Sequence, residues 1–148
     1  MKKLSEKNQK SQKMELHRIK QSGFRNYPLG DFLIKIKNAV MANSKEVDYP
    51  EIKAVLALAD VLKKAGFLED VYTKDGKIVA KIAFQSKAPV MFGLKLISRP
   101  GLRIYRNVAE IETKKGPSIL LLATSRGVLT STDCVRERVG GEVIAEIW

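Results

Sequence analysis

The side chains that most often carry out catalysis are scarce in this sequence. His17 is the single histidine and Cys134 the single cysteine, so neither a Ser-His-Asp triad nor a Cys-His pair is expected. A zinc site needs several Cys or His ligands, which these two residues do not supply. Neighbouring acids such as Glu69 and Asp70 are typical of a solvated surface, and no glycine-rich loop matches a nucleotide fingerprint. The sequence therefore predicts no enzyme, no cofactor and no small-molecule substrate.

A different set of residues suits the binding of a polyanion. Thr124, Ser125, Arg126 and Gly127 follow the apolar run 119–123, so they should emerge where a buried strand leaves the core. Hydroxyl groups donate to and accept from base edges and ribose 2′-OH groups, and arginine pairs with phosphate. A glycine lets the backbone approach a ligand closely. The bland alternative is an ordinary glycine-containing turn.

Two more segments carry similar chemistry. In 98–106, Arg99, Arg103 and a third arginine surround Tyr105, which suits phosphate binding with one ring for packing. The alternative, a solvated turn with Tyr105 in the core, stays open at this point. Residues 140–142 form a Gly-Gly-Glu corner, where a side chain on Gly141 would block a close approach to the ligand or strain a positive φ.

The charge balance agrees with a polyanionic partner. The chain of 148 residues carries 27 Lys and Arg against 16 Asp and Glu, a net charge of +11. Residues 1–30 hold eight basic and two acidic groups, 31–86 nine and eight, and 87–148 ten and six. The excess therefore lies in the N-terminal segment and the C-terminal part. A surface made basic for solubility alone is the alternative.

Targeting and membrane signals are weak. No apolar run approaches the roughly 18 residues that cross a bilayer, so no membrane association is expected. The N-terminal segment has no apolar stretch of a secretory signal, and we interpret it as a basic arm of the working protein. A single cysteine fits a reducing compartment.

Hydrophobic periodicity predicts an N-terminal half of helix, helix and hairpin. The expected elements are a helix over 32–42 with Asp31 as N-cap, a helix from Pro50 to Gly66, and strands over 67–73 and 77–84 around Asp75-Gly76. One apolar face of the hairpin should be covered by the helices.

The second half is expected to be mostly β. Strands are predicted over 90–98, 102–105, 118–124 and 142–148, with a connection at 107–116, a tight loop at 125–127, and a helix over 130–138 that Thr130 or Ser131 caps and Gly140-Gly141 ends. The overall prediction is an α+β fold of two small packed lobes. Residues 1–28 form the arm, 29–86 the N-terminal α/β lobe and 87–148 the C-terminal, mostly β binding lobe.

Three motifs of the second half carry a family resemblance: Ser98-Arg99-Pro100-Gly101 running into Arg103-Ile104-Tyr105, the segment 124–130, and 140–143. Together with segments 31–39 and 62–68 they resemble the S-eight family of small-subunit ribosomal proteins, of bacterial or organellar type. The resemblance covers about residues 29–148. It does not extend to the arm.

The resemblance implies a structural, RNA-binding subunit of the ribosome. Its expected partners are the central domain of small-subunit ribosomal RNA and neighbouring ribosomal proteins, in the cytoplasm or in an organelle. The residues it nominates for RNA binding are Thr124, Ser125, Arg126, Gly127, Gly141 and Glu142, with Tyr105 near the RNA, and the arginine-rich segment adds Arg99 and Arg103. Ala123 departs from the family pattern, which has a hydroxyl there. A free-standing RNA-binding translational regulator using the same surface is the alternative.

Overall fold

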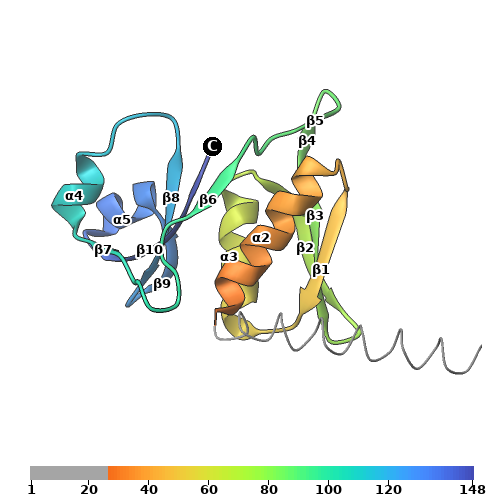
Figure 1. Cartoon of the computed structure of the whole chain (residues 1–148), viewed down its shortest axis with the longest axis horizontal. Helices are drawn as coiled ribbons and strands as arrows, with labels where there is room; N and C mark the ends of the chain where they lie inside the picture. The colour runs from red at the N-terminus through yellow and green to blue at the C-terminus, as the bar shows by residue number, and fades with distance from the viewer. Residues whose placement is uncertain (1–26) are drawn as a thin grey trace, which may run out of the picture.

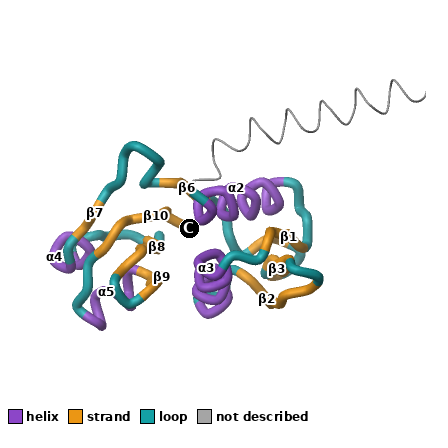
Figure 2. The backbone as a smooth tube through the Cα atoms, turned by 90° about the horizontal axis from the view of Figure 1, so that it is seen from below, coloured by secondary structure: helices purple, strands orange, loops and turns teal. Residues whose placement is uncertain are grey.

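The computed structural model describes residues 27–148, so expectations for the basic arm over residues 1–26 lie outside the described residues. The fold is α+β, as predicted: helices and antiparallel sheets alternate along the chain (Figure 1). Figure 2 shows the layers, with α2 (Pro28–Met41) and α3 (Lys53–Lys64) between two sheets. Each helix therefore packs against the first sheet on one side and against the second sheet on the other.

The first sheet contains β1 (Glu46–Pro50), β3 (Lys77–Ile82) and β2 (Leu68–Lys74), in that order and all antiparallel. The predicted hairpin is confirmed, and its turn is made by Asp75 (φ 53°) and Gly76 (φ 72°). Two positive φ values in succession suit the right-handed twist of a two-residue hairpin. Helices α2 and α3 pack on one face of this sheet.

Three expectations for the first half were wrong. Helix α2 begins at Pro28 and not after Asp31, because proline already has the φ of a first helical turn; Asp31 lies within that turn. Pro50 ends a strand instead of opening a helix, and α3 begins at Lys53. Strand β1 was not predicted. Its alternating residues Val47 and Tyr49 pack against the core, which a five-residue segment signals only weakly.

The second sheet runs in the order β6 (Leu94–Leu96), β10 (Gly141–Ile147), β8 (Ile119–Thr124) and β9 (Gly127–Thr130), with β7 (Tyr105–Arg106) also paired to β10. Two short helices, α4 (Val108–Glu112) and α5 (Ser131–Glu137), cover its outer face. In the sequence between the two sheets, β4 (Phe84–Gln85) and β5 (Ala88–Pro89) form a small separate hairpin, which lies beyond the end of β3 in Figure 1.

In this half the strand over 118–124 and the Thr130 cap are confirmed, and the connection at 107–116 contains the short helix α4. The Thr130 hydroxyl accepts the backbone N–H of Asp133 at 3.3 Å. The expected strand over 90–98 shrinks to β6, and that over 102–105 to β7. Helix α5 ends at Arg138, which takes the left-handed conformation (φ 55°), and not at the two glycines. Strand β9 was not predicted, since the expected loop ended at Gly127 and the expected helix began at Thr130.

The hydrophobic core joins both sheets. One cluster combines Phe32, Leu58 and Ile78 with Leu121 and Ile144 from the second sheet. A smaller cluster lies under α4 and α5 and includes the fully buried Cys134, whose burial raises the pKa of its thiol to about 11. Cys134 is therefore a structural residue, as expected. The division into lobes at residue 86 stays a prediction.

Candidate nucleic-acid interface

Strand register brings the predicted binding residues to one end of the second sheet. Glu142 of β10 lies opposite Tyr105 of β7 on one side and opposite Ala123 of β8 on the other, and Ala123 pairs in turn with Val128 of β9. Directly opposed residues in antiparallel strands point to the same face of a sheet. Three segments that are far apart in the sequence therefore meet in one row, near the β7, β10 and β9 labels (Figure 1).

The turn between β8 and β9 is held by Thr124. Its hydroxyl donates to the carbonyl of Gly127 at 2.7 Å and accepts the backbone N–H of Arg126 at 3.1 Å. Gly127 has φ 98°, a conformation that L side chains rarely adopt. Ser125, Arg126 and Gly127 are exposed at the tip. The Thr124 hydroxyl thus shapes the turn, and the groups presented to a ligand are those of the next three residues.

Arg126 projects from this turn toward the end of α5. Its guanidinium lies 3.4 Å from a carboxylate oxygen of Glu137, and the Arg126 side chain is 60% exposed. An exposed ion pair of this length is weak, because water solvates both charges. A phosphate can therefore displace Glu137 with little loss of energy.

The two glycines at the start of β10 are needed for packing. A Cβ on Gly140 would collide with the backbone of Arg106, and one on Gly141 with the carbonyl of Ala123. Neither glycine is among the residues of positive φ, so the alternative of a strained positive φ at Gly141 does not apply. Strand β10 passes so close to β7 and β8 that no side chain fits between the strands. The two glycines are therefore required by the close packing of the strands, independently of any RNA contact.

Glu142 and Arg103 are bound to each other. Their nearest nitrogen and oxygen atoms are 2.9 Å apart, and the Glu142 side chain is only 18% exposed. The Arg103 guanidinium also lies over the ring of Tyr27, with 4.7 Å from its central carbon to the ring centroid. Tyr27 is 6% exposed, and its burial, together with the Glu142 charge, raises the pKa of the phenol to about 12.

The loop before β7 presents Arg99 and Tyr105. Ser98 is fully buried, and its hydroxyl accepts the backbone N–H of Ile104 at 3.0 Å, which closes the loop. A bridge between Arg99 and Leu102 and the positive φ of Gly101 complete the turn. Tyr105 is 66% exposed, so the alternative with its ring in the core is wrong. Both Arg99 and Tyr105 are open to a ligand.

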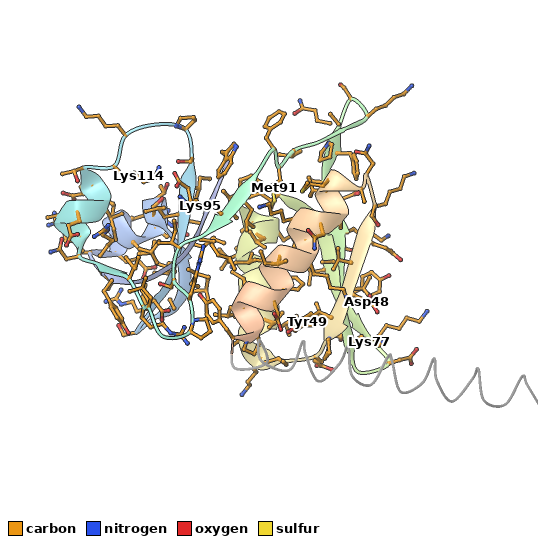
Figure 3. The ribbon with its side chains drawn as sticks, in the orientation of Figure 1. Asp48, Tyr49, Lys77, Met91, Lys95 and Lys114 are labelled. Carbon is orange, nitrogen blue, oxygen red and sulfur yellow. The ribbon has the colours of Figure 1, made fainter. Side chains whose placement is uncertain are left out.

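Sequence reasoning missed two lysines near this loop. Lys37 on α2 and Lys95 on β6 line a groove of about 530 Å³ together with Arg99, Asp31 and the Tyr27 ring. Figure 3 labels Lys95 beside β6, at the second sheet. Burial raises the pKa of the Asp31 carboxyl, and a hydrogen bond from Tyr49 opposes that rise. In the sequence, Lys37 is only one of the polar residues on the predicted helix. The tertiary fold is needed to bring it close to Arg99.

Among residues 27–148 there is no group of three His, Cys, Asp or Glu placed to hold a metal ion. The same part of the chain contains no helix long and apolar enough to cross a membrane. The features that remain are an exposed hydroxyl-and-arginine turn, a glycine corner and a loop with an open tyrosine. Together they are typical of a small α+β protein that binds nucleic acid through loops.

Comparison with known proteins identifies the family. The chain belongs to the ribosomal protein S8 family, whose model matches residues 27–148. The small ribosomal subunit protein uS8 of Nitratidesulfovibrio vulgaris (strain DP4) is 41% identical over 122 residues, covering 82% of this chain and 97% of that protein. The protein of the same name from Roseiflexus castenholzii is 40% identical over 129 residues, covering 83% and 98%. The family resemblance of the sequence motifs is thereby confirmed.

Proposed function

We propose that this protein is a structural constituent of the small ribosomal subunit, that it binds the central domain of small-subunit ribosomal RNA, and that it supports the assembly of that domain. The names of its relatives support the ribosomal role. The single observation that carries the RNA contact is the row formed by β7, β10, β8 and the turn into β9. It would be located in the ribosome of a bacterial cytoplasm and would contact other small-subunit proteins.

The exposed groups in and beside this row are the proposed contacts. Ser125 and the Gly127 backbone would approach ribose and base edges, while Arg126 and Arg99 would meet phosphates. Tyr105 offers an open ring on which a base or a ribose can pack. Thr124 and Gly141 would contribute indirectly, without contacting RNA. The Thr124 hydroxyl shapes the turn, and the missing side chain of Gly141 lets the strands pack closely.

Ala123 fits this proposal despite the missing hydroxyl. It is partly buried against the main core cluster, on the face of the sheet that turns inward to the helices. A hydroxyl at this position would point the same way. The RNA contact is therefore proposed to begin one residue later, at the turn.

We further propose that residues 29–86 and 87–148 act as two lobes with different tasks. The second lobe carries the row of RNA contacts. The first lobe supplies α2 and α3 as the support on which the second sheet rests. On its outer sheet, Asp48 of β1 pairs with Lys77 of β3 at 3.3 Å (Figure 3). Lys35 of α2 lies 3.6 Å from the same carboxylate.

A binding titration tests the function. The full-length protein should bind a transcript of the small-subunit central domain more tightly than a scrambled transcript of equal length, by about tenfold or more at physiological salt. Co-sedimentation with small subunits through high salt should separate a structural constituent from a free regulator. Equal affinity for both transcripts, with no protein in the subunit fraction, would contradict the proposal.

A further inference from the structure

Three side chains from separate elements meet at the corner where β10 begins. Tyr27 precedes the first turn of α2, Arg103 lies in the loop before β7, and Glu142 is the second residue of β10. The Arg103 guanidinium lies between the other two, 2.9 Å from a Glu142 oxygen and 4.7 Å from the Tyr27 ring centroid. This triad links the helix layer to the end of the second sheet.

The backbone around Arg103 is fixed as well. The next residue, Ile104, donates its backbone N–H to the Ser98 hydroxyl oxygen, and its carbonyl accepts the backbone N–H of Val143 at 2.8 Å. Arg103 therefore starts from an anchored position and points toward Glu142. The Glu142 carboxylate in turn raises the pKa of the guanidinium, so the charge on Arg103 is held by a partner within the protein.

The Arg103 guanidinium donates to Glu142 through Nη1 and lies with one face over the Tyr27 ring, so a phosphate would have to compete with partners that the protein already supplies. Glu142, at 18% exposure, is poorly placed to read a base. The two residues therefore differ from Arg126 and Ser125, which are exposed at a turn.

We propose that Tyr27 and Arg103 are positioning residues: they fix the Glu142 carboxylate and the strands β7 and β10 in the spacing that RNA requires, and Arg103 forms no phosphate contact in the complex. The inference rests on the proposed RNA-binding function, in which these residues would hold the start of β10 in place. Tyr27 lies far from the other two in the sequence, so its part depends entirely on the tertiary fold.

Neutralising Glu142 separates this proposal from a direct contact by the sign of the effect. If Arg103 contacted a phosphate, Glu142→Gln would release the arginine and remove a negative charge near RNA, so affinity would rise. If Arg103 positions the corner, the same change weakens its anchor, because the amide oxygen of Gln accepts a hydrogen bond but carries no charge, so affinity falls. Arg103→Lys gives a second contrast, because lysine keeps the charge but has no planar fork to bond and stack at once.

The experiment titrates full-length protein with a central-domain transcript at several salt concentrations. Arg103→Gln, Glu142→Gln and Arg103→Lys should each weaken binding by about tenfold, and the Arg103→Gln/Glu142→Gln double variant should be no weaker than the weaker single one. The slope of log affinity against log salt should not change. Arg126→Gln is the matched control, because it should lower that slope.

Tyr27 provides a conservative rescue. Tyr27→Phe keeps the ring under the guanidinium and should bind RNA within about twofold of the wild type, whereas Tyr27→Leu should weaken binding as Arg103→Gln does. All titrations are run well below the melting temperature of each variant, which circular dichroism monitors.

Tighter binding by Glu142→Gln, or a slope that falls by roughly 0.7–0.9 in Arg103→Gln, would overturn the inference while leaving the proposed function intact. Wild-type RNA affinity in the Arg103→Lys variant would likewise overturn the inference and leave the proposed function intact. A wild-type protein that does not prefer the central-domain transcript would overturn the proposed function, and this inference with it.

Discussion

The turn between β8 and β9 and the corner formed by β7 and β10 are built from the same residue types, yet they differ in what they expose. Each contains an arginine paired with a glutamate and a glycine in a critical place. At the turn, Arg126 is 60% exposed and 3.4 Å from Glu137; at the corner, Arg103 is 36% exposed and 2.9 Å from Glu142. The same pair can therefore present a charge to a ligand or fix a backbone, depending on burial and on what lies beneath it.

The glycines differ in the same way. Gly127 has a positive φ and open space where its side chain would be, whereas Gly141 is extended and faces the backbone of β8. The cost of a side chain at the first is conformational and local. At the second it is a clash with atoms that cannot move without separating two strands.

The largest expected effect follows from that contrast. Gly141→Ala should lower the free energy of unfolding by about 3 kcal/mol, because its Cβ would overlap the Ala123 carbonyl. Gly127→Ala should cost about 1–2 kcal/mol through its positive φ. Urea denaturation of both variants measures the difference. A Gly141 variant as stable as the Gly127 variant would remove the structural role assigned to the corner.

A second comparison separates two neighbouring hydroxyls. Ser125→Ala should weaken RNA binding by about 1 kcal/mol and leave the melting temperature unchanged, because Ser125 is exposed. Thr124→Val should weaken RNA binding and, in addition, lower the free energy of unfolding by about 1 kcal/mol. The Thr124 hydroxyl is hydrogen-bonded to Gly127 and Arg126 within the turn, and valine lacks it. Changing both to alanine should reduce affinity by about 1–3 kcal/mol. Unchanged affinity in the double variant would exclude the turn as a contact.

Arg126 and Glu137 test the exposed pair. Arg126→Gln should lower the slope of log affinity against log salt by roughly 0.7–0.9, the value for one lost phosphate contact. Glu137→Gln should bind RNA slightly more tightly than the wild type, because it frees Arg126 and removes a nearby negative charge. This sign is opposite to the one expected for Glu142→Gln. Equal signs for the two glutamates would show that turn and corner do not differ.

The smallest effect concerns pH. The pKa of Tyr27 is raised from 10.0 to about 12, so between these values the unfolded chain loses the phenol proton while the folded protein keeps it. Folding stability should therefore fall with rising pH across that window, whereas below pH 10 the phenol is protonated in both states and stability is fully retained. The Tyr27→Phe variant should lose less stability than the wild type over the same window in chemical denaturation. Parallel losses would mean that the phenol is not buried in solution.

Sequence reasoning predicted the elements that have a long apolar pattern. Helices α2 and α3, the hairpin at Asp75-Gly76, strand β8 and the Thr130 cap all follow from local periodicity or turn chemistry. Strands β1 and β9 were missed, because each is short and its pairing partner is supplied by the tertiary fold. The bounds of α2 were displaced because Pro28 competes with Asp31 as the start signal, and proline wins at the first turn.

For the candidate site, the sequence nominated segments that the fold brings to one end of the second sheet, but it did not give the contacts of each residue. It placed Arg103 beside Arg99 as an equivalent basic group, and only the fold places Tyr27 and Glu142 around the former. It left open whether a side chain on Gly141 would block RNA or strain a positive φ, whereas the register of β10 places that glycine against the Ala123 carbonyl. Distances between strands are not contained in local patterns, so these roles required the structure.

The most direct test of the account is an NMR titration of the labelled protein with a central-domain RNA fragment. The account predicts that the largest changes of backbone amide shifts occur at 124–127, 99–106 and 141–142, which form one end of the second sheet. The outer face of the first sheet, where Asp48 is paired with Lys35 and Lys77, should change little. Changes concentrated on that outer face, with the turn and the corner unaffected, would contradict the proposed interface.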